Sequence, residues 1–295
     1  MISTDLIKKI RHIEIRTRRL VNDSYAGEYH SIFKGRGMAF DEVRPYQIGD
    51  EIRTIDWNVT ARTGEPYVKR YVEERELSVM LVVDASGSED FGSKDRFKRE
   101  LAAEITAVLS FAATSNNDKV GLLIFTDQIE LYIPPRKGRR HVLRLIRELL
   151  AFKPKGRGTD VNLALETVNQ ILKRRSIIFL ISDFISDPNS YKRAISITNK
   201  RHDVIAVDLI DPLEMKMQDV GLVLLEDPET REVVLVDTSS PEWQKAFSQR
   251  TGSLETELKR ILNQANVDRI QINTSEEYTV PLTSFFKERA RRIRR

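Results

Sequence analysis

Apolar segments of two kinds alternate along the greater part of the chain. In the first kind nearly every position is apolar and many residues are β-branched, as in Leu77–Val83, Val120–Phe125, Ile177–Ile181 and Val204–Ile210. This pattern is typical of strands that are buried on both faces. In the second kind apolar residues recur at the spacing of one helix face, which predicts helices over Arg96–Ser115, Arg139–Phe152, Val161–Lys173 and Asn189–Lys200. The alternation predicts a doubly wound α/β domain with a mostly parallel sheet.

Two further patterns add antiparallel pairs to this arrangement. Gln128–Ile133 alternates apolar and polar residues after a turn, so we expect it to pair antiparallel with the preceding strand. Leu222–Leu225 and Glu232–Val236 flank the turn residues Asp227-Pro228-Glu229-Thr230, which predicts a small inserted β-hairpin. The remaining segments of the domain predict a helix over Pro241–Ala265, a strand over Ile270–Ile272 and a helix over Leu282–Arg294.

The residues ahead of this domain follow a different pattern. Apolar residues at helical spacing among basic ones predict an amphipathic first helix over Leu6–Leu20. A segment punctuated by Gly and Pro follows from Asn22 to Pro66 and shows no regular periodicity. We therefore divide the chain into an N-terminal extension, residues 1–75, and an α/β domain, residues 76–295.

Composition narrows the class of protein and the kind of site. The chain has 295 residues, of which 40% are hydrophobic and 31% charged, as expected of a well-cored globular protein. It contains no cysteine, which excludes disulfides, thiolate metal sites and cysteine nucleophiles. The first residues lack the apolar core of a signal peptide, and the longest apolar runs are too short to span a bilayer. We therefore expect a cytoplasmic protein without a transmembrane segment.

Charge gives little support to a nucleic-acid partner. The formal net charge of +4 is small for a chain of this length. Basic residues do gather in Leu6–Leu20 and in Lys287–Arg295, and these segments support a subsidiary hypothesis of polyanion binding. Solvated helix ends and a frayed terminus explain them more simply, so no specific nucleic acid is expected.

Oxygen-bearing side chains follow the predicted strands. In doubly wound sheets, ligands bind beyond the carboxyl ends of the strands. The polar set at this rim includes neither histidine nor cysteine, and hard oxygen ligands favour Mg²⁺, Mn²⁺ or Ca²⁺. The set consists of Asp84, Ser86 and Ser88 after the first strand, Thr126 and Asp127 after the second, Thr159 and Asp160 before a helix, and Ser182 and Asp183 after the third.

Part of this set resembles a known metal site. Asp84-x-Ser86-x-Ser88, Thr159 behind a glycine and Asp183 behind an apolar strand are similar to the metal-ion-dependent adhesion site of von Willebrand factor A domains. The resemblance covers nearly all of the predicted α/β domain. It implies a von Willebrand factor A-like, Rossmann-like fold. It also implies a metal ligated directly by the two serines and the threonine, with the two aspartates acting directly or through water.

A site of this composition suits the capture of a partner protein. A cation held mainly by neutral hydroxyl groups keeps much of its positive charge, so a carboxylate from another protein can complete its coordination shell. We therefore predict a metal-dependent protein–protein interaction module and not an enzyme. The predicted cation is Mg²⁺, with Mn²⁺ or Ca²⁺ possible, and its ligands are Asp84, Ser86, Ser88, Thr159 and Asp183.

A second resemblance lies in the N-terminal extension. The run Arg44-Pro45-Tyr46-Gln47-Ile48-Gly49-Asp50, followed by Arg53, Ile55-Asp56-Trp57 and Ala61-Arg62, is similar to the signature of a bacterial family of unknown function. Its members carry a von Willebrand factor A-like core and are often associated with MoxR-type AAA+ ATPases. The resemblance implies a protein partner, either a MoxR-type AAA+ ATPase or its substrate, and a role as an adaptor.

Each of these groups also has a purely structural interpretation. The three polar residues after the first strand can cap the next helix or form an Asx-turn. Thr126 and Asp127 suit the turn of a hairpin, and Asp160 suits the N-cap of the following helix. For Arg44–Arg62 we favour a network of ion pairs that holds the extension onto the sheet, with Trp57 as a packing anchor, over a ligand site.

Several enzyme motifs are missing from the sequence. A phosphatase of the haloacid dehalogenase type has a second acid two residues after its first aspartate, where this chain has Ser86. No Gly-rich loop ends in Lys and Ser or Thr, and Ser86 does not lie in a Gly-x-Ser-x-Gly elbow. A magnesium-dependent phosphoester hydrolase stays as the alternative function, because Mg²⁺ polarises phosphoryl oxygens.

Overall fold

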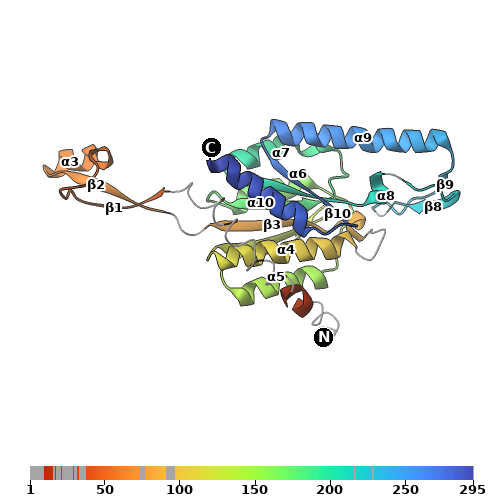
Figure 1. Cartoon of the computed structure of the whole chain (residues 1–295), viewed down its shortest axis with the longest axis horizontal. Helices are drawn as coiled ribbons and strands as arrows, with labels where there is room; N and C mark the ends of the chain where they lie inside the picture. The colour runs from red at the N-terminus through yellow and green to blue at the C-terminus, as the bar shows by residue number, and fades with distance from the viewer. Residues whose placement is uncertain are drawn as a thin grey trace.

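The computed structural model describes the greater part of the chain. Figure 1 shows an α/β body with a separate hairpin unit on one side. The predicted first helix falls largely outside the described residues, and within it residues 10–15 are helical. The described residues are 10–15, 17, 21, 29, 32, 38–73, 77–90, 97–215, 217–227 and 229–294.

A six-stranded sheet forms the centre of the body. Its order is β10-β7-β6-β3-β4-β5, and all neighbours are parallel except β4 and β5. This confirms the predicted doubly wound α/β fold and the antiparallel strand at its edge. The strands are β3 (Ser78–Asp84), β4 (Lys119–Phe125), β5 (Ile129–Arg136), β6 (Ile177–Ser182), β7 (Asp203–Ile210) and β10 (Asp268–Asn273).

Helices cover both faces of the sheet, because successive residues of a strand point to opposite sides. In β3, Val79, Leu81 and Val83 belong to one hydrophobic core, and Met80 and Val82 belong to the other. Each such buried side chain stabilises the fold by about 1.5–3 kcal/mol. The first core is covered by α4 (Lys98–Ser115), α5 (Arg139–Ala151) and α10 (Thr279–Arg294), and the second by α6 (Val161–Ile171), α7 (Pro188–Arg201) and α9 (Pro241–Gln264).

The connections change sides between β3 and β6. From β3 the chain passes to β4 and β5 on one side, and it then returns to β6, β7 and β10 on the other. A crevice at the carboxyl ends of two such strands is where open α/β sheets bind ligands. Asp84 is the last residue of β3, and Asp183 directly follows β6. The fold therefore brings two of the predicted site residues to this crevice.

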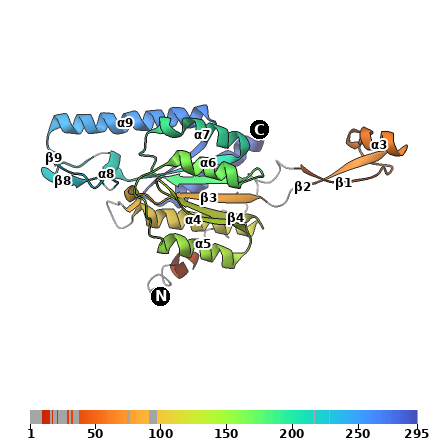
Figure 2. The same cartoon turned by 180° about the vertical axis from the view of Figure 1, so that it is seen from behind.

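Residues 38–73 form a hairpin unit where the sequence predicted no regular element as far as residue 66. Asp56 caps the helix of this unit by accepting from the backbone N–H groups of Asn58 and Val59. Figure 2 shows the unit projecting away from the body. Exposed residues predominate from residue 45 to residue 66, and of the strand side chains whose burial is described only Val68 is buried, so burial periodicity does not mark this segment. The elements are β1 (Met38–Pro45), η2 (Ile52–Thr54), α3 (Trp57–Thr63) and β2 (Tyr67–Glu73), with β1 and β2 antiparallel.

Among the described residues, the ion pairs found for the hairpin unit join residues within it. Arg44 Nη2 lies 2.7 Å from Asp50 Oδ1, and Lys69 Nζ lies 3.4 Å from Asp56 Oδ2. The Trp57 side chain is 66% exposed. The prediction that these residues hold the extension onto the sheet, with Trp57 as packing anchor, is therefore wrong.

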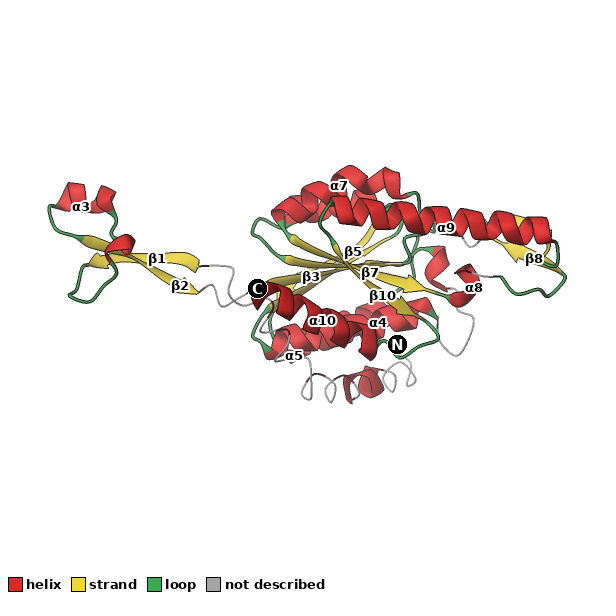
Figure 3. Cartoon of the chain, turned by 45° about the horizontal axis from the view of Figure 1, so that its top comes forward, coloured by secondary structure: helices red, strands yellow, loops and turns green. Residues whose placement is uncertain are grey.

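The inserted hairpin is present as predicted. It follows the short helix α8 (Pro212–Met215), and it pairs β8 (Leu222–Glu226) with β9 (Val233–Asp237). Figure 3 shows it at the end of the body opposite the hairpin unit. The turn of this hairpin bears on the candidate site through Glu229.

Candidate metal centre

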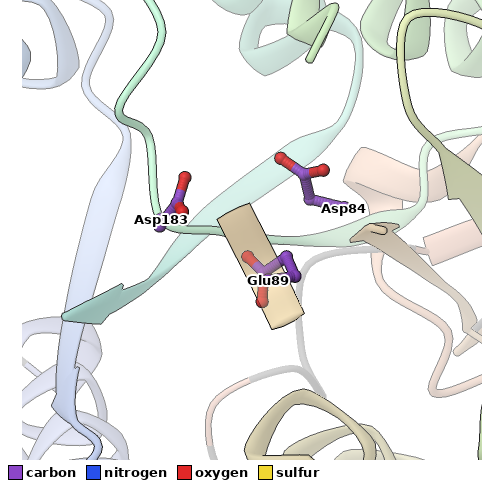
Figure 4. Close-up of side chains that lie close together, drawn as sticks. All are labelled: Asp84, Glu89 and Asp183. Carbon is purple, nitrogen blue, oxygen red and sulfur yellow. The ribbon is translucent and has the colours of Figure 1, made fainter. Parts of the chain in front are cut away.

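Three acidic side chains meet at the crevice between β3 and β6. Asp84 ends β3, Asp183 follows β6, and Glu89 lies in the short helix η3 (Gly87–Asp90). Each residue offers a carboxylate oxygen within 4.8 Å of those of the other two, and Figure 4 shows the three side chains close together. All three are buried, with at most 8% of any of them exposed. We call Asp84, Glu89 and Asp183 the acidic cluster.

Asp84 is fixed by two hydrogen bonds. Its Oδ1 accepts from the backbone N–H of Ser86 at 2.9 Å, and its Oδ2 accepts from the Ser182 hydroxyl at 2.8 Å. The first bond is the local turn that the structural interpretation of the motif expected. Burial, together with the negative charge of Asp183, raises the pKa of Asp84 to about 7.

Two of the predicted hydroxyl ligands lie next to each other. Ser86 Oγ and Ser88 Oγ are 3.1 Å apart, and both residues are buried. The backbone N–H of Glu89 donates to the Ser86 carbonyl at 3.2 Å. The turn that sets the two serines therefore also positions Glu89.

Glu89 was not among the predicted site residues. It is 1% exposed, and neither of its carboxylate oxygens has a hydrogen-bond partner within the described part of the chain. Burial, and then the charges of Asp183 and Asp84, raise the pKa of Glu89 well above its usual range. The sequence offered one signal for Glu89 as a site residue, which is its position directly after Ser88. A buried acid without a partner is costly, and a bound cation is one physical explanation for it.

A buried lysine also faces the acidic cluster. Lys98 Nζ donates to Asp183 Oδ2 at 2.8 Å and also to Glu214 of α8, and its side chain is fully buried. Burial lowers the pKa of Lys98, but the charges of Asp183 and Glu214 outweigh that effect, so the net shift is upward. Burial also raises the pKa of Glu214 to about 7. A cation in the first turn of α4 opposes the helix dipole, so these carboxylates are what hold it there.

Thr159 has a partner that the sequence did not suggest. Its hydroxyl donates to Glu229 Oε1 at 2.8 Å, so the β8–β9 turn reaches the loop before α6. That loop is also joined to the Ser86–Ser88 turn, because the N–H of Gly87 donates to the carbonyl of Arg157 at 2.9 Å. Burial raises the pKa of Glu229. Of the predicted ligands, Asp84 therefore lies close to Asp183, and Ser86 lies close to Ser88. Thr159 instead forms a hydrogen bond with Glu229.

Two structural expectations from the sequence are confirmed at this rim. Asp160 Oδ1 accepts from the N–H of Leu163 at 2.8 Å and caps α6. Thr126 and Asp127 lie in the turn between β4 and β5, where the N–H of Thr126 donates to the carbonyl of Gln128 at 2.9 Å. Asp160, Thr126 and Asp127 are therefore explained by local structure and are not needed to explain the acidic cluster.

The donor set at the crevice is made of oxygen atoms. Carboxylates and serine hydroxyls are ligands for hard cations such as Mg²⁺, Mn²⁺ and Ca²⁺. The set holds more carboxylate than predicted, because Glu89 joins the two aspartates. Lys98 is shared between Asp183 and Glu214, so with Asp84 and Glu89 the one ammonium group leaves three negative charges unbalanced when all four acids are ionised.

Similarity to solved structures concerns the fold. The chain resembles an aerotolerance-related membrane protein from Bacteroides fragilis with a TM-score of 0.52 and 15% identity, over 73% of this chain and 99% of that one. It also matches a von Willebrand factor type A structure from Catenulispora acidiphila with a TM-score of 0.43 and 13% identity, over 76% of this chain and 44% of that one. The mostly parallel six-stranded sheet with helices on both faces is the doubly wound arrangement that the resemblance to von Willebrand factor A domains implied.

The predicted cytoplasmic location is wrong. It was inferred from the lack of an apolar run long enough to span a bilayer. The structurally similar Bacteroides fragilis protein is a membrane protein, so this fold gives no ground for placing the chain in the cytoplasm. Among the residues that the structure describes, no helix has the length and apolarity needed to cross a bilayer.

Similarity in sequence extends over almost the whole chain. The chain is 29% identical to the uncharacterized proteins Rv1480 of Mycobacterium tuberculosis and Mb1516 of Mycobacterium bovis, over 97% of this chain and 90% of each relative. A family profile matches residues 42–257, a range that includes the predicted signature between residues 44 and 62. The chain therefore belongs to the family described as "Protein of unknown function DUF58".

Proposed function

We propose that the chain is a metal-dependent protein-interaction module whose metal centre is the acidic cluster with Ser86 and Ser88. The observation that carries the proposal is Glu89, a buried carboxylate without a hydrogen-bond partner among the described residues, close to Asp84 and Asp183. A von Willebrand factor A-like fold supports an interaction module as the general class.

The residues at the crevice fit a divalent cation. Three acidic oxygens lie within 4.8 Å of one another, a separation that ligands of a single ion can have. The adjacent Ser86 and Ser88 hydroxyls offer two neutral donors. Asp84, Asp183, Glu89 and the two serines would hold the ion, and the bound ion would supply a positive charge for an external carboxylate.

Burial restricts access to this centre. The described side chains of the acidic cluster are at most 8% exposed, so a partner's carboxylate needs an opening at the rim. The loop that carries Thr159 and the β8–β9 turn that carries Glu229 meet at this rim through one hydrogen bond. Separation of these two segments would widen the approach. The hydrolase alternative needs the same access for a larger phosphate ester, and no contact among the described residues favours it.

The partner that we propose is a MoxR-type AAA+ ATPase, for which the chain acts as an adaptor. Support comes from the signature in the hairpin unit and its resemblance to a family often associated with such ATPases. The exposed Trp57 and the internally paired Arg44 and Asp50 leave the outer surface of this unit available for contacts.

Capture of a purified MoxR-type ATPase from the same source tests the proposal. We expect wild type to retain the ATPase in magnesium and to release it in EDTA, and Asp84→Asn to retain little in either condition. Asp219→Asn removes an exposed acid and is the matched control. Equal retention by wild type and Asp84→Asn, with and without EDTA, would rule out the metal-dependent grip.

A further inference from the structure

A cavity of about 280 Å³ adjoins the acidic cluster. It lies beyond the carboxyl ends of β6 and β7, between α8 and one face of α9. Figure 1 shows α8 beside this end of the sheet, with α9 running above it. Asp183 and Glu214 belong both to the cavity wall and to the charged network around Lys98. The cavity therefore shares Asp183 with the proposed metal centre.

The cavity wall is mainly apolar, from its floor to its mouth. Phe184 and Leu258 are buried at 2% and 4% exposure, whereas Ile185 and Met215 are 47% and 40% exposed. Exposed apolar side chains grouped at the mouth of a cavity are typical of an interaction site. Phe184 has a φ of +52°, a conformation that a bulky residue rarely adopts. The Ser182 hydroxyl holds it there by accepting from the Phe184 N–H at 3.1 Å.

The charged groups of the wall are of two kinds. Arg269 binds Asp208 and Glu255, with Nη1 to Glu255 Oε1 at 2.8 Å, so these charges are satisfied within the protein. Arg250 is exposed, and no hydrogen bond or ion pair to its guanidinium is found within the described residues. A ligand in the cavity therefore contacts apolar side chains, with the Arg250 guanidinium at one side and Asp183 of the acidic cluster at the other.

We infer that this cavity receives a large apolar side chain of the partner segment whose neighbouring Asp or Glu reaches the metal centre. The volume suits such a side chain, because an apolar cavity of about 150 Å³ already accommodates benzene. Consecutive Cα atoms are about 3.8 Å apart, so in a segment that turns at the rim one side chain can fill the cavity while its neighbour reaches the Asp183 edge. The inference deepens the proposed function and rests on it.

Short synthetic peptides test the pairing of an apolar and an acidic residue. The probes are acetylated, amidated Gly-Phe-Asp-Gly, Gly-Ala-Asp-Gly and Gly-Phe-Asn-Gly, titrated into the full chain by NMR with magnesium or with EDTA. We expect the Phe-Asp peptide to bind in magnesium at least tenfold more tightly than the Ala-Asp peptide. Equal affinities of these two peptides, or no binding of the Phe-Asp peptide, would overturn the inference.

Two variants connect that preference to the cavity. Leu254→Trp fills the cavity from α9, and we expect it to abolish the preference for Phe, whereas Ser253→Trp on the exposed side of α9 keeps it. Met215→Ala at the mouth provides a milder change, expected to reduce the preference, should Leu254→Trp fail to fold. A full preference for Phe in a folded Leu254→Trp or Met215→Ala variant contradicts the inference.

The same titrations separate this inference from the proposed function. Peptide binding that requires magnesium and the Asp residue, with equal affinities for the Phe-Asp and Ala-Asp peptides, refutes the inference that the cavity receives an apolar side chain. That result remains consistent with the proposed metal centre. Equal affinities of the Phe-Asp and Phe-Asn peptides, both higher than that of the Ala-Asp peptide and unaffected by EDTA, support the apolar site and refute the metal-dependent grip.

Discussion

At the scale of single residues, Glu89 and Lys98 change the chemistry of the crevice. Both are buried, and each faces Asp183 from a different element, one from η3 and the other from α4. Together they turn a predicted hydroxyl-rich site into a cluster of carboxylates with one internal ammonium group. The balance of charge in this cluster is therefore the property to perturb.

Glu89→Gln tests whether a cation balances the buried acids. In EDTA we expect the variant to be more stable than wild type by roughly 1 kcal/mol, since a buried unpaired carboxylate is lost. For a magnesium dissociation constant of about 0.1–1 mM, magnesium at about 1 mM should stabilise wild type by roughly 0.4–1.4 kcal/mol, and the variant by less. Urea unfolding with magnesium or EDTA measures both effects. Glu232→Gln is an exposed control, and an unchanged magnesium effect in Glu89→Gln would exclude Glu89 as a ligand.

Lys98→Met tests the internal ammonium group. Removing one partner of a buried ion pair leaves Asp183 and Glu214 uncompensated, so we expect a loss of about 3–5 kcal/mol in EDTA. Magnesium should restore stability in this variant by more than it adds to wild type, because the added charge replaces the lost one. Chemical denaturation provides the measurement, with the exposed Lys245→Met as control. A loss below about 1 kcal/mol would show that the ion pairs of Lys98 contribute little to the free energy of unfolding.

The sequence alone was sufficient to place Asp84 and Asp183 at one edge of the sheet. Each follows a strand that is apolar throughout, and parallel strands end on the same side. Glu89 and Lys98 were not predictable in this way, because their positions depend on how η3 and the first turn of α4 fold back over the crevice. Glu229 was read as a turn residue, and only the packing of the β8–β9 turn against residues 153–159 reveals its bond to Thr159.

At the scale of elements, burial decides which parts were predictable. Strands buried on both faces have an unmistakable pattern, and β3, β4, β6 and β7 were all predicted within a few residues of their bounds. In β1 and β2 the side chains whose burial the structure describes are exposed or half-buried, except Val68, so these strands have no such pattern and the hairpin unit was missed. Hydrophobic periodicity predicts single elements, so it does not predict contacts between elements such as the one that Glu229 makes with Thr159.

Glu229→Ala tests the contact between the β8–β9 turn and the loop before α6. We expect a loss of about 0.5–1.5 kcal/mol, as for one hydrogen bond, together with faster amide exchange in residues 153–159. Hydrogen–deuterium exchange of wild type and variant measures the local effect. Exchange that is unchanged in this loop would show that the bond does not restrain it.

His202 at the end of α7 predicts a pH dependence of stability. The ring is 2% exposed, and neither ring nitrogen has a hydrogen-bond partner among the described residues. Burial, and then the charges of Arg201 and Arg175, lower the pKa of His202 in the folded protein. The unfolded chain binds a proton first as the pH falls, so this contribution is present above the ordinary pKa of about 6.5 and is lost below it.

His202→Gln isolates that contribution from the buried acids, whose raised pKa values act in the opposite sense. Between about pH 7.5 and 5.5, we expect wild type to lose stability relative to the variant. Urea unfolding in EDTA at both pH values gives the difference. Parallel pH profiles for the two proteins would refute the assignment.

At the scale of the whole molecule, the chain consists of a closely packed body and a projecting hairpin unit. The body has two cores that share the central sheet, whereas the hairpin unit exposes Ile48, Ile52 and Trp57. The family match begins at residue 42 and so includes most of this unit. A surface role for the unit agrees better with its exposure than the anchoring role that we predicted.

Trp57→Ala distinguishes these two roles. Because Trp57 is 66% exposed, we expect stability to change by no more than about 0.5 kcal/mol. Phe179→Ala in the central sheet, where the side chain is fully buried, should cost about 3–5 kcal/mol. Thermal and urea unfolding measure both variants. A loss at Trp57 as large as that at Phe179 would restore the anchoring role.

The crevice between β3 and β6 also has a consequence for biosynthesis. Ser182 and its acceptor Asp84 are 98 residues apart in the chain, and β6 docks directly against β3. A ribosome that has released only β3, β4 and β5 presents an incomplete half-sheet in which Asp84 lacks both Ser182 and Asp183. Under the proposed function, an ion added at that moment would find no assembled site, so its loading would follow the emergence of β6 and would not template the first half of the domain.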